Sequence, residues 1–164
     1  MNLKRSKYTT KADFIVIGAG IAGSSAACRL SQHGKVIILE KESSPGYHTT
    51  GRSAAFFTEN YGNSKIRAIT RASRNFLEKP PRFFGNNKLM HNYGGSLFIA
   101  NKSQNQLIEN ELKYSKSNKA NILEISPSEA LIKVPIIKKE YLHRALIEPD
   151  AKSMDVDLIH QGFL

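Results

Sequence analysis

The sequence predicts an α/β fold in which a parallel strand–helix–strand unit precedes part of a mixed-sheet α+β domain. Three observations support this: short β-branched runs at 13–17 and 35–39, an Ala- and Leu-rich segment between them, and changed patterns after residue 85. Continuous apolar runs of this length are typical of strands buried on both faces of a parallel sheet. Parallel strands require a crossover, which a helix over 21–33, closed by Gly34, would supply.

The composition is that of a globular protein, with 164 residues of which 40% are hydrophobic and 23% charged. The longest apolar run, Phe14 to Ala27, is broken by glycines and serines, so we expect no transmembrane segment. A single cysteine and no secretory leader favour a reducing, cytoplasmic location. The net charge of +10 is scattered, which favours a solvated surface over nucleic-acid binding and leaves contact with an anionic membrane surface open.

A long loop is expected over 41–62, which has no helical or strand period, and loops of this length are often functional. An amphipathic helix over 64–78 follows, and Pro80 and Pro81 end it. One face of this helix is apolar, and we expect its opposite, basic face to be solvated. The basic face comprises Lys65, Arg67, Arg71 and Arg74.

The rest of the chain alternates strands with polar helical stretches. We expect strands around 95–100, 122–125 and 141–147. Ser126 to Glu129 form a capping box that opens a short helix, and Asp155 begins a final helix with an apolar face.

A glycine motif carries the first functional signal. Gly18, Gly20 and Gly23 stand at the turn from the first strand into the helix, where they permit a tight turn, close approach of a pyrophosphate and close helix–strand packing, respectively. The helix N-terminus attracts an anion. Glu40 ends the second strand, where a carboxylate can accept hydrogen bonds from the ribose hydroxyls of an adenosine and would repel a 2'-phosphate. The alternative is that Glu40 is only an exposed charge at the end of a strand. The unit therefore predicts Rossmann-like dinucleotide binding.

The segment from Glu40 to Phe56 resembles flavin-binding sequence in the FAD-dependent amine oxidoreductases of the D-amino acid oxidase superfamily. The resemblance implies FAD as the cofactor, with the loop along its flavin side. Independently of the resemblance, the hydroxyls of this loop suit the polar ribityl chain of FAD, and its small residues suit the flat flavin ring. NAD is the weaker alternative, because the loop would have no evident role in binding it. The cofactor-binding residues implied are Gly18, Gly20, Ile21, Ala22, Gly23, Glu40, Lys41, Thr49, Thr50, Gly51, Arg52, Ser53, Ala54 and Ala55.

Two side chains in this loop have alternative roles. Arg52 pairs either with a pyrophosphate or with a nearby carboxylate. His48 either contacts the cofactor or stabilises the loop. The spacing of the five histidines predicts no metal site, and no catalytic residue is assigned.

Within the superfamily the chain is most similar to bacterial D-arginine dehydrogenases over nearly its whole length. That resemblance implies oxidation of the Cα–N bond of a D-amino acid, with hydride transfer to flavin, an imino acid that hydrolyses to a 2-oxo acid, and an unidentified electron acceptor. Tyr61 matches a loop tyrosine near the substrate, although a half-buried structural aromatic is an equal alternative. The resemblance also places Phe56 beside flavin and substrate, at a position where the family has a histidine. Gly95 falls where an acidic residue holds a basic substrate side chain, so a preference for arginine is not expected.

The resemblance also implies a domain organisation. Residues 1–85 form the N-terminal part of the FAD-binding domain, 86–152 part of the substrate domain, and 153–164 the start of a helix returning to the first domain. We expect an incomplete, N-terminal fragment whose substrate-carboxylate residues lie beyond Leu164. Two alternatives stay open: an inactive nucleotide-binding remnant, and a related oxidoreductase acting on another amine or a 2-hydroxy acid.

Overall fold

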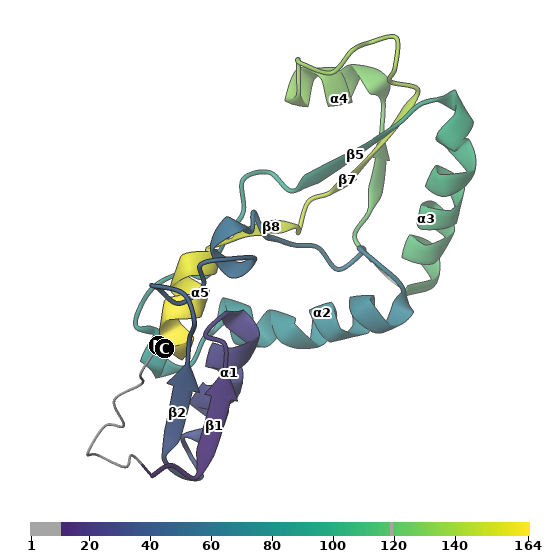
Figure 1. Cartoon of the computed structure of the whole chain (residues 1–164). Coiled ribbons are helices and arrows are strands. Elements are labelled where there is room, and N and C mark those ends of the chain that lie inside the picture. The colour runs from purple at the N-terminus through teal and green to yellow at the C-terminus, as the bar shows by residue number, and fades with distance from the viewer. Residues whose placement is uncertain (1–10, 119) are drawn as a thin grey trace. The chain divides into compact units, whose positions relative to one another are not determined.

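The computed structural model describes residues 11–118 and 120–164, which form two compact units (Figure 1). Within these residues, unit 1 comprises 11–53, 81–87 and 156–164, and unit 2 comprises the remainder. The predicted FAD-binding domain differs from unit 1 over 54–80, which pack in unit 2, and its first ten residues lie outside the described ones. In the described part of the chain, no helix has the length and apolar character needed to cross a membrane.

Unit 1 contains the predicted strand–helix–strand unit, formed by β1 (Phe14–Ile17), α1 (Ile21–Leu30) and β2 (Val36–Leu39). The strands are parallel, with the first residues of each opposite one another, which confirms the predicted α/β fold class. The expected glycine cap is wrong, because α1 ends at Leu30 and Ser31 is its C-cap. Gly34 instead fits closely against Asp13, whose carboxylate accepts a hydrogen bond from the Lys35 amide at 2.8 Å.

The last helix of the chain, α5 (Val156–Phe163), also belongs to unit 1, where it packs against α1 and two short 3-10 helices, η1 (Thr50–Arg52) and η2 (Arg82–Phe84). Gly162 permits this packing, because a Cβ there would overlap the Phe84 ring. The Phe84 and Phe163 rings meet edge to face at 5.1 Å between centroids. The helix predicted at the end of the chain therefore closes the core of unit 1.

Unit 2 is built on an antiparallel sheet of order β5–β7–β6, with α3 along it (Figure 1). Side chains alternate between the faces of a strand, so Ala145 and Leu146 of β7 point to opposite sides. Leu146 packs with Ile108 of α3, and Ala145 packs with Ala130 of α4, so the two helices cover opposite faces. The elements are β5 (Ser96–Ala100), η3 (Lys102–Gln104), α3 (Asn105–Asn118), β6 (Leu123–Ile125), α4 (Pro127–Lys133) and β7 (Arg144–Glu148).

A second small sheet in unit 2 has the order β3–β8–β4, from β3 (Phe56–Phe57), β4 (Met90–His91) and β8 (Lys152–Met154). The prediction of an irregular loop over 41–62 was therefore wrong at η1 and β3. The strand expected over 141–147 begins only at Arg144. Two-residue strands such as β3 are held by partners almost a hundred residues away, so no local alternation marks them.

Side-chain caps begin two helices of unit 2, α2 and α4. The predicted capping box of α4 is confirmed: the Glu129 amide donates to Ser126 Oγ at 3.2 Å, and the Ser126 amide donates to Glu129 Oε2 at 2.8 Å. The Ser126 hydroxyl also donates to Glu129 Oε2 at 2.7 Å, and this bond, followed by that from the Ser126 amide, lowers the pKa of the Glu129 carboxyl. At the start of α2 (Ser64–Glu78), Asn63 Oδ1 accepts from the amides of Lys65 and Ile66. The bounds of α2 are those predicted.

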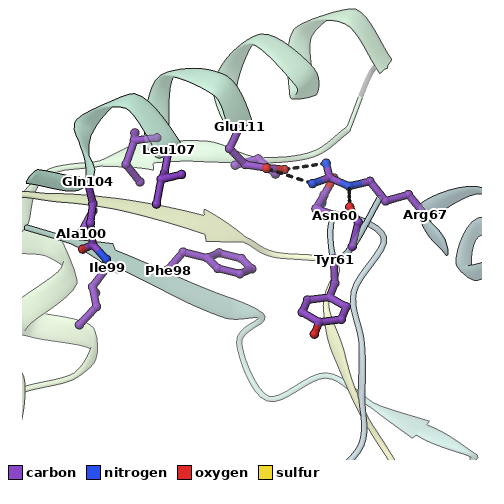
Figure 2. A pocket seen from close by; sticks show the side chains of 12 residues that line it. Asn60, Tyr61, Arg67, Phe98, Ile99, Ala100, Gln104, Leu107 and Glu111 are labelled. Atoms are coloured by element: carbon purple, nitrogen blue, oxygen red, sulfur yellow. Dashed lines mark hydrogen bonds and ion pairs between the residues drawn. The ribbon is translucent and has the colours of Figure 1, made fainter. Parts of the chain in front are cut away.

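The expected solvation of the basic face of α2 was wrong at two arginines. Arg67 makes a two-bond ion pair with Glu111 of α3 at 2.8 and 3.1 Å (Figure 2), and Arg74 pairs with Glu59 at 2.7 Å. Ile69, on the apolar face, is 63% exposed. Periodicity divides a helix into two faces, but acidic side chains from other elements decide which face packs within this unit.

Candidate cofactor-binding site

The glycine motif has the geometry that its spacing predicted. Gly18 has φ +94°, in the left-handed region that favours glycine. Gly20 is the N-cap of α1, in an extended conformation. Gly23, in the first turn of the helix, leaves no room for a side chain, because a Cβ there would overlap the Gly18 carbonyl oxygen. The strand, turn and helix therefore pack through backbone atoms.

The first amides of α1 have no acceptor within the helix, as at any helix N-terminus. The Ile21 amide donates to Thr50 Oγ1 at 3.0 Å, and the Ser24 amide donates to the Gly20 carbonyl at 2.9 Å. The Ala22 and Gly23 amides make no hydrogen bond to any of the described residues. These two donors, together with the positive end of the helix, suit an anionic group such as a pyrophosphate.

Thr50 closes the glycine loop from a segment well along the chain. It is buried in η1, and its side-chain oxygen caps α1. Two backbone bonds support it: the Gly46 amide donates to the Ala19 carbonyl at 3.1 Å, and the Gly51 amide donates to the Gly46 carbonyl at 2.7 Å. The hydroxyl that the sequence assigned to cofactor binding thus first builds the site, and its proton stays available as a donor.

The Glu40 carboxylate is held against the glycine loop. Its Oε2 accepts from the Ala19 amide at 2.7 Å, and its Oε1 accepts from the amides of Lys41 at 2.7 Å and Glu42 at 3.0 Å. Hydrogen bonds from the Glu42 and Ala19 backbones lower the pKa of this carboxyl. The group is therefore fixed and ionised, and Oε2, which accepts one hydrogen bond, keeps accepting capacity for a ribose hydroxyl.

This geometry gives a pH-dependent prediction. The pKa of Glu40 is lower in the folded chain than in the unfolded chain, so its contribution to stability is present above the unfolded pKa and is lost as the pH falls through the folded pKa. Carbon-detected NMR titration should give a midpoint below that of Glu40 in the urea-unfolded chain. Glu40→Gln should lose less stability than the unmutated chain on acidification. Equal midpoints in the folded and unfolded chains would contradict the arrangement.

A cavity of about 200 Å³ adjoins these groups within unit 1. His48 borders it and pairs with Glu42 through Nε2 and Oε1 at 3.0 Å, which favours the loop-stabilising alternative for this histidine. Tyr47 packs edge to face on the His48 ring, with 5.1 Å between centroids. The lining residues are Gly20, Glu40, Glu42, Gly46, Tyr47, His48, Thr49 and Thr50, of which four were predicted cofactor contacts. The Glu40 carboxylate and the glycine backbone that line this cavity, with the free amides of Ala22 and Gly23 in the first turn of α1, fit the ribose and pyrophosphate of a dinucleotide.

Comparison with known families agrees with this fit. The sequence matches the DAO family, described as FAD dependent oxidoreductase, over residues 13–164. The chain belongs to this family. FAD, which the loop sequence predicted, is the cofactor of the family.

Solved structures confirm the fold and show how much of it is present. L-proline dehydrogenase from P. horikoshii matches with a TM-score of 0.75 and 20% identity over 95% of this chain and 41% of its own. Glycine oxidase from Bacillus cereus matches with a TM-score of 0.75 and 21% identity over 93% of this chain and 42% of its own. L-α-glycerophosphate oxidase from Mycoplasma pneumoniae, with FAD bound, matches with a TM-score of 0.76 and 18% identity over 94% of this chain and 42% of its own. The chain spans about two fifths of the length of these DAO-fold proteins.

The other predicted cofactor residues lie at the end of the loop. The Arg52 guanidinium lies over the Tyr47 ring, 5.5 Å from its centroid, and forms no ion pair with any residue that the structure describes. Ser53 ends η1 in unit 1, whereas Ala54 and Ala55 belong to unit 2. The Ala55 carbonyl accepts from the Met154 amide at 3.0 Å. This loop thus passes from the glycine site into the small sheet of unit 2.

The two predicted substrate residues are both exposed in unit 2. Phe56 lies in β3 and is 47% exposed. Tyr61 precedes α2 and is 71% exposed, which disagrees with the half-buried structural role considered from the sequence. Both aromatic side chains are therefore available for contact with another group.

The structure explains why Gly95 carries no acidic side chain. Gly95 has φ +87°, and a Cβ there would overlap the Glu148 carbonyl oxygen. The nearby Glu148 side chain is buried, and its oxygens accept from Thr58 Oγ1 at 2.5 Å and from the Glu59 amide at 3.0 Å. This carboxylate holds the loop between β3 and α2, a role that no local sequence pattern indicates.

His160 of α5 is a further part of the cofactor-site architecture that the sequence did not reveal. It is buried, and its Nε2 donates to the Ala19 carbonyl at 2.8 Å. Its ring also lies where a Cβ on Gly46 would approach Cε1 to 2.8 Å. Gly46 has φ +72°, and Pro45 before it is the typical sequence signal for such a turn. The imidazole therefore supports the glycine loop from the end of the chain.

Proposed function

We propose that this chain provides the FAD-binding part of an oxidoreductase that oxidises the Cα–N bond of D-amino acids. The observation that supports this most is the combination, within one unit, of the unbonded Ala22 and Gly23 amides with the fixed Glu40 carboxylate. When bound, FAD supplies the hydride acceptor for oxidation of the substrate to an imino acid, which hydrolyses to a 2-oxo acid.

In this proposal, the residues of the chain hold and orient the cofactor. The Ala22 and Gly23 amides bind the pyrophosphate, while Glu40 Oε2 accepts a hydrogen bond from ribose. Thr50 and His160 keep the glycine loop in place through the Ile21 amide and the Ala19 carbonyl. No metal-binding group of three or more His, Cys, Asp or Glu side chains occurs among the described residues.

Phe56 and Gly95 indicate which substrate side chains the protein favours. A phenyl ring cannot accept hydrogen bonds in the plane of a guanidinium, and the Gly95 backbone leaves no space for an acidic partner. Desolvating a cation without a partner costs several kcal/mol, about 3 or more, whereas cation–π attraction returns about 0.5–2 kcal/mol. We therefore propose that apolar D-amino acids are better substrates than D-arginine.

The test measures dye-linked oxidation of a D-amino acid panel by the protein at the full length of its family. We expect kcat/KM for D-leucine, D-methionine and D-phenylalanine to exceed that for D-arginine by about tenfold or more. Phe56→His should narrow this difference, while Tyr93→His, at another exposed aromatic of unit 2, should not. A clear preference of the unmutated enzyme for D-arginine would refute the assignment of substrate side chain.

Two other functions are distinguishable by the same measurements. The glycerophosphate oxidase with a similar fold acts on a different class of compound, so oxidation of 2-hydroxy acids or other amines, but not of D-amino acids, would favour a related oxidoreductase. Bound flavin that no substrate bleaches would favour a nucleotide-binding remnant without turnover.

A further inference from the structure

Ala19, between the first two glycines of the motif, is held through both of its backbone polar groups. Its carbonyl accepts two hydrogen bonds, from the Gly46 amide at 3.1 Å and from His160 Nε2 at 2.8 Å. Its amide donates to Glu40 Oε2 at 2.7 Å, and the residue is only 3% exposed. The peptide that joins Ala19 to Gly20 is therefore fixed at its carbonyl end by two donors from other parts of the chain.

The orientation of this peptide determines where the Gly20 amide points. In a trans peptide the C=O and the N–H lie in one plane and point in opposite directions. Since His160 donates to the Ala19 oxygen, the Gly20 N–H points away from the imidazole. It makes no hydrogen bond to any residue that the structure describes, and Gly20 lines the cavity beside the glycine loop. With the amides of Ala22 and Gly23, it provides a third free donor for a pyrophosphate.

His160 itself does not line that cavity. It is 3% exposed in α5, and its ring packs against Gly46, where a Cβ would approach Nδ1 to 3.0 Å. Because a carbonyl oxygen can only accept, Nε2 carries the proton of its hydrogen bond to Ala19. The imidazole can therefore act on a ligand of the cavity only through the backbone that it holds.

We propose that His160 is a positioning residue for FAD: its Nε2–H fixes the Ala19 carbonyl, and so directs the Gly20 amide at the pyrophosphate. The proposal deepens the proposed function and rests on its FAD-binding part. The competing role is packing, in which the ring only fills space in the core of unit 1. Packing requires a side chain of similar size but no N–H, so the two roles differ at one proton.

FAD titrations of the flavin-free chain, followed by flavin fluorescence, separate the two roles. His160→Gln keeps an N–H near the place of imidazole Nε2, whereas His160→Leu fills the space without a donor. We expect His160→Leu to bind FAD at least about tenfold more weakly than the unmutated chain, and His160→Gln to bind within about threefold of it. A packing role predicts no advantage of glutamine, because a buried amide is costlier to desolvate than a leucine side chain.

Ile159→Val is the matched control in the same helix. Ile159 is also buried in α5, and its aliphatic side chain offers no hydrogen bond to the glycine loop. The substitution should lower the midpoint of urea unfolding, because it removes a buried methylene, and should leave the FAD affinity of the folded chain unchanged.

The unmutated chain gives an independent test, since nitrogen-15 NMR of the His160 ring shows which nitrogen carries a proton. We expect a protonated Nε2. An unprotonated Nε2 would overturn the proposal even where neither His160 variant folds.

Three results of the titrations would also overturn it: full FAD affinity of His160→Leu, equally weak binding by His160→Gln and His160→Leu, or equally weak binding by Ile159→Val and His160→Leu. Absence of FAD binding by the unmutated chain would overturn both this proposal and the FAD-binding part of the proposed function. No D-amino acid is present in these titrations, so failure of the proposed reaction would not change their outcome.

Discussion

Gly20→Val is expected to abolish FAD retention while the chain stays folded. The extended backbone at Gly20 accepts any residue, so the substitution introduces no conformational strain. A Cβ at Gly20 would lie 3.2 Å from Thr50 Oγ1, and the two methyl groups of valine would occupy space beside the free amides of α1. Charge-assisted hydrogen bonds contribute about 1.5–3 kcal/mol each, so losing two of them should weaken FAD binding by at least about a hundredfold.

Flavin absorbance of the purified protein measures this effect, with circular dichroism as the check on folding. Thr50→Val is the matched control, because it removes the side-chain acceptor of the Ile21 amide without filling the space at Gly20. The loss of that bond is worth about 1 kcal/mol, so Thr50→Val should weaken FAD binding only about fivefold. Full flavin content in folded Gly20→Val would show that the cofactor does not approach this backbone.

Much of unit 1 follows from local sequence. The β-branched runs and the three glycines each act within a few residues of their neighbours, and the two strands and the start of the helix lie where the sequence predicts them. Glu40 directly follows the second strand, as predicted. The fold class was predictable for the same reason. The predicted end of the helix was wrong, because the close fit of Gly34 against Asp13 is a tertiary contact rather than a helix cap.

The groups that hold the site together come from distant parts of the chain. Thr50 caps the Ile21 amide 29 residues away, and His160 reaches the Ala19 carbonyl across 141 residues. No spacing rule connects such pairs, and each residue taken alone resembles an ordinary loop hydroxyl or a helical histidine. The resemblance to flavoproteins identified Thr50, but it assigned the side chain to the cofactor rather than to the helix.

Unit 2 shows a second limit of sequence reasoning. The period of α2 predicted its length, but Arg67 and Arg74 pack against carboxylates while Ile69 is exposed. Asn60 and Glu148 are buried polar residues whose roles depend on contacts between elements. Burial of a polar side chain requires partners that a single sequence does not reveal.

Gly23→Ala should give the largest loss of stability in unit 1. Alanine normally stabilises a helix relative to glycine by about 1 kcal/mol. Here its Cβ would overlap the Gly18 carbonyl oxygen, a backbone atom held between β1 and α1, and would also approach Val16 Cγ1 to 3.3 Å. Overpacking against a backbone that cannot yield should destabilise by about 3 kcal/mol or more, which outweighs the gain in helix propensity.

Urea unfolding of the two variants Gly23→Ala and Gly18→Ala separates this effect from loss of glycine itself. Gly18 has φ +94°, but a Cβ there would meet no atom within 4 Å. Gly18→Ala should therefore lose only the about 1–2 kcal/mol that a left-handed conformation costs an L-residue. Because domains are stable by only about 5–15 kcal/mol, the further loss in Gly23→Ala should shift the unfolding midpoint well below that of Gly18→Ala. Coincident midpoints would mean that the strand and helix can separate without loss, and that the third glycine of the motif has no packing role in this chain.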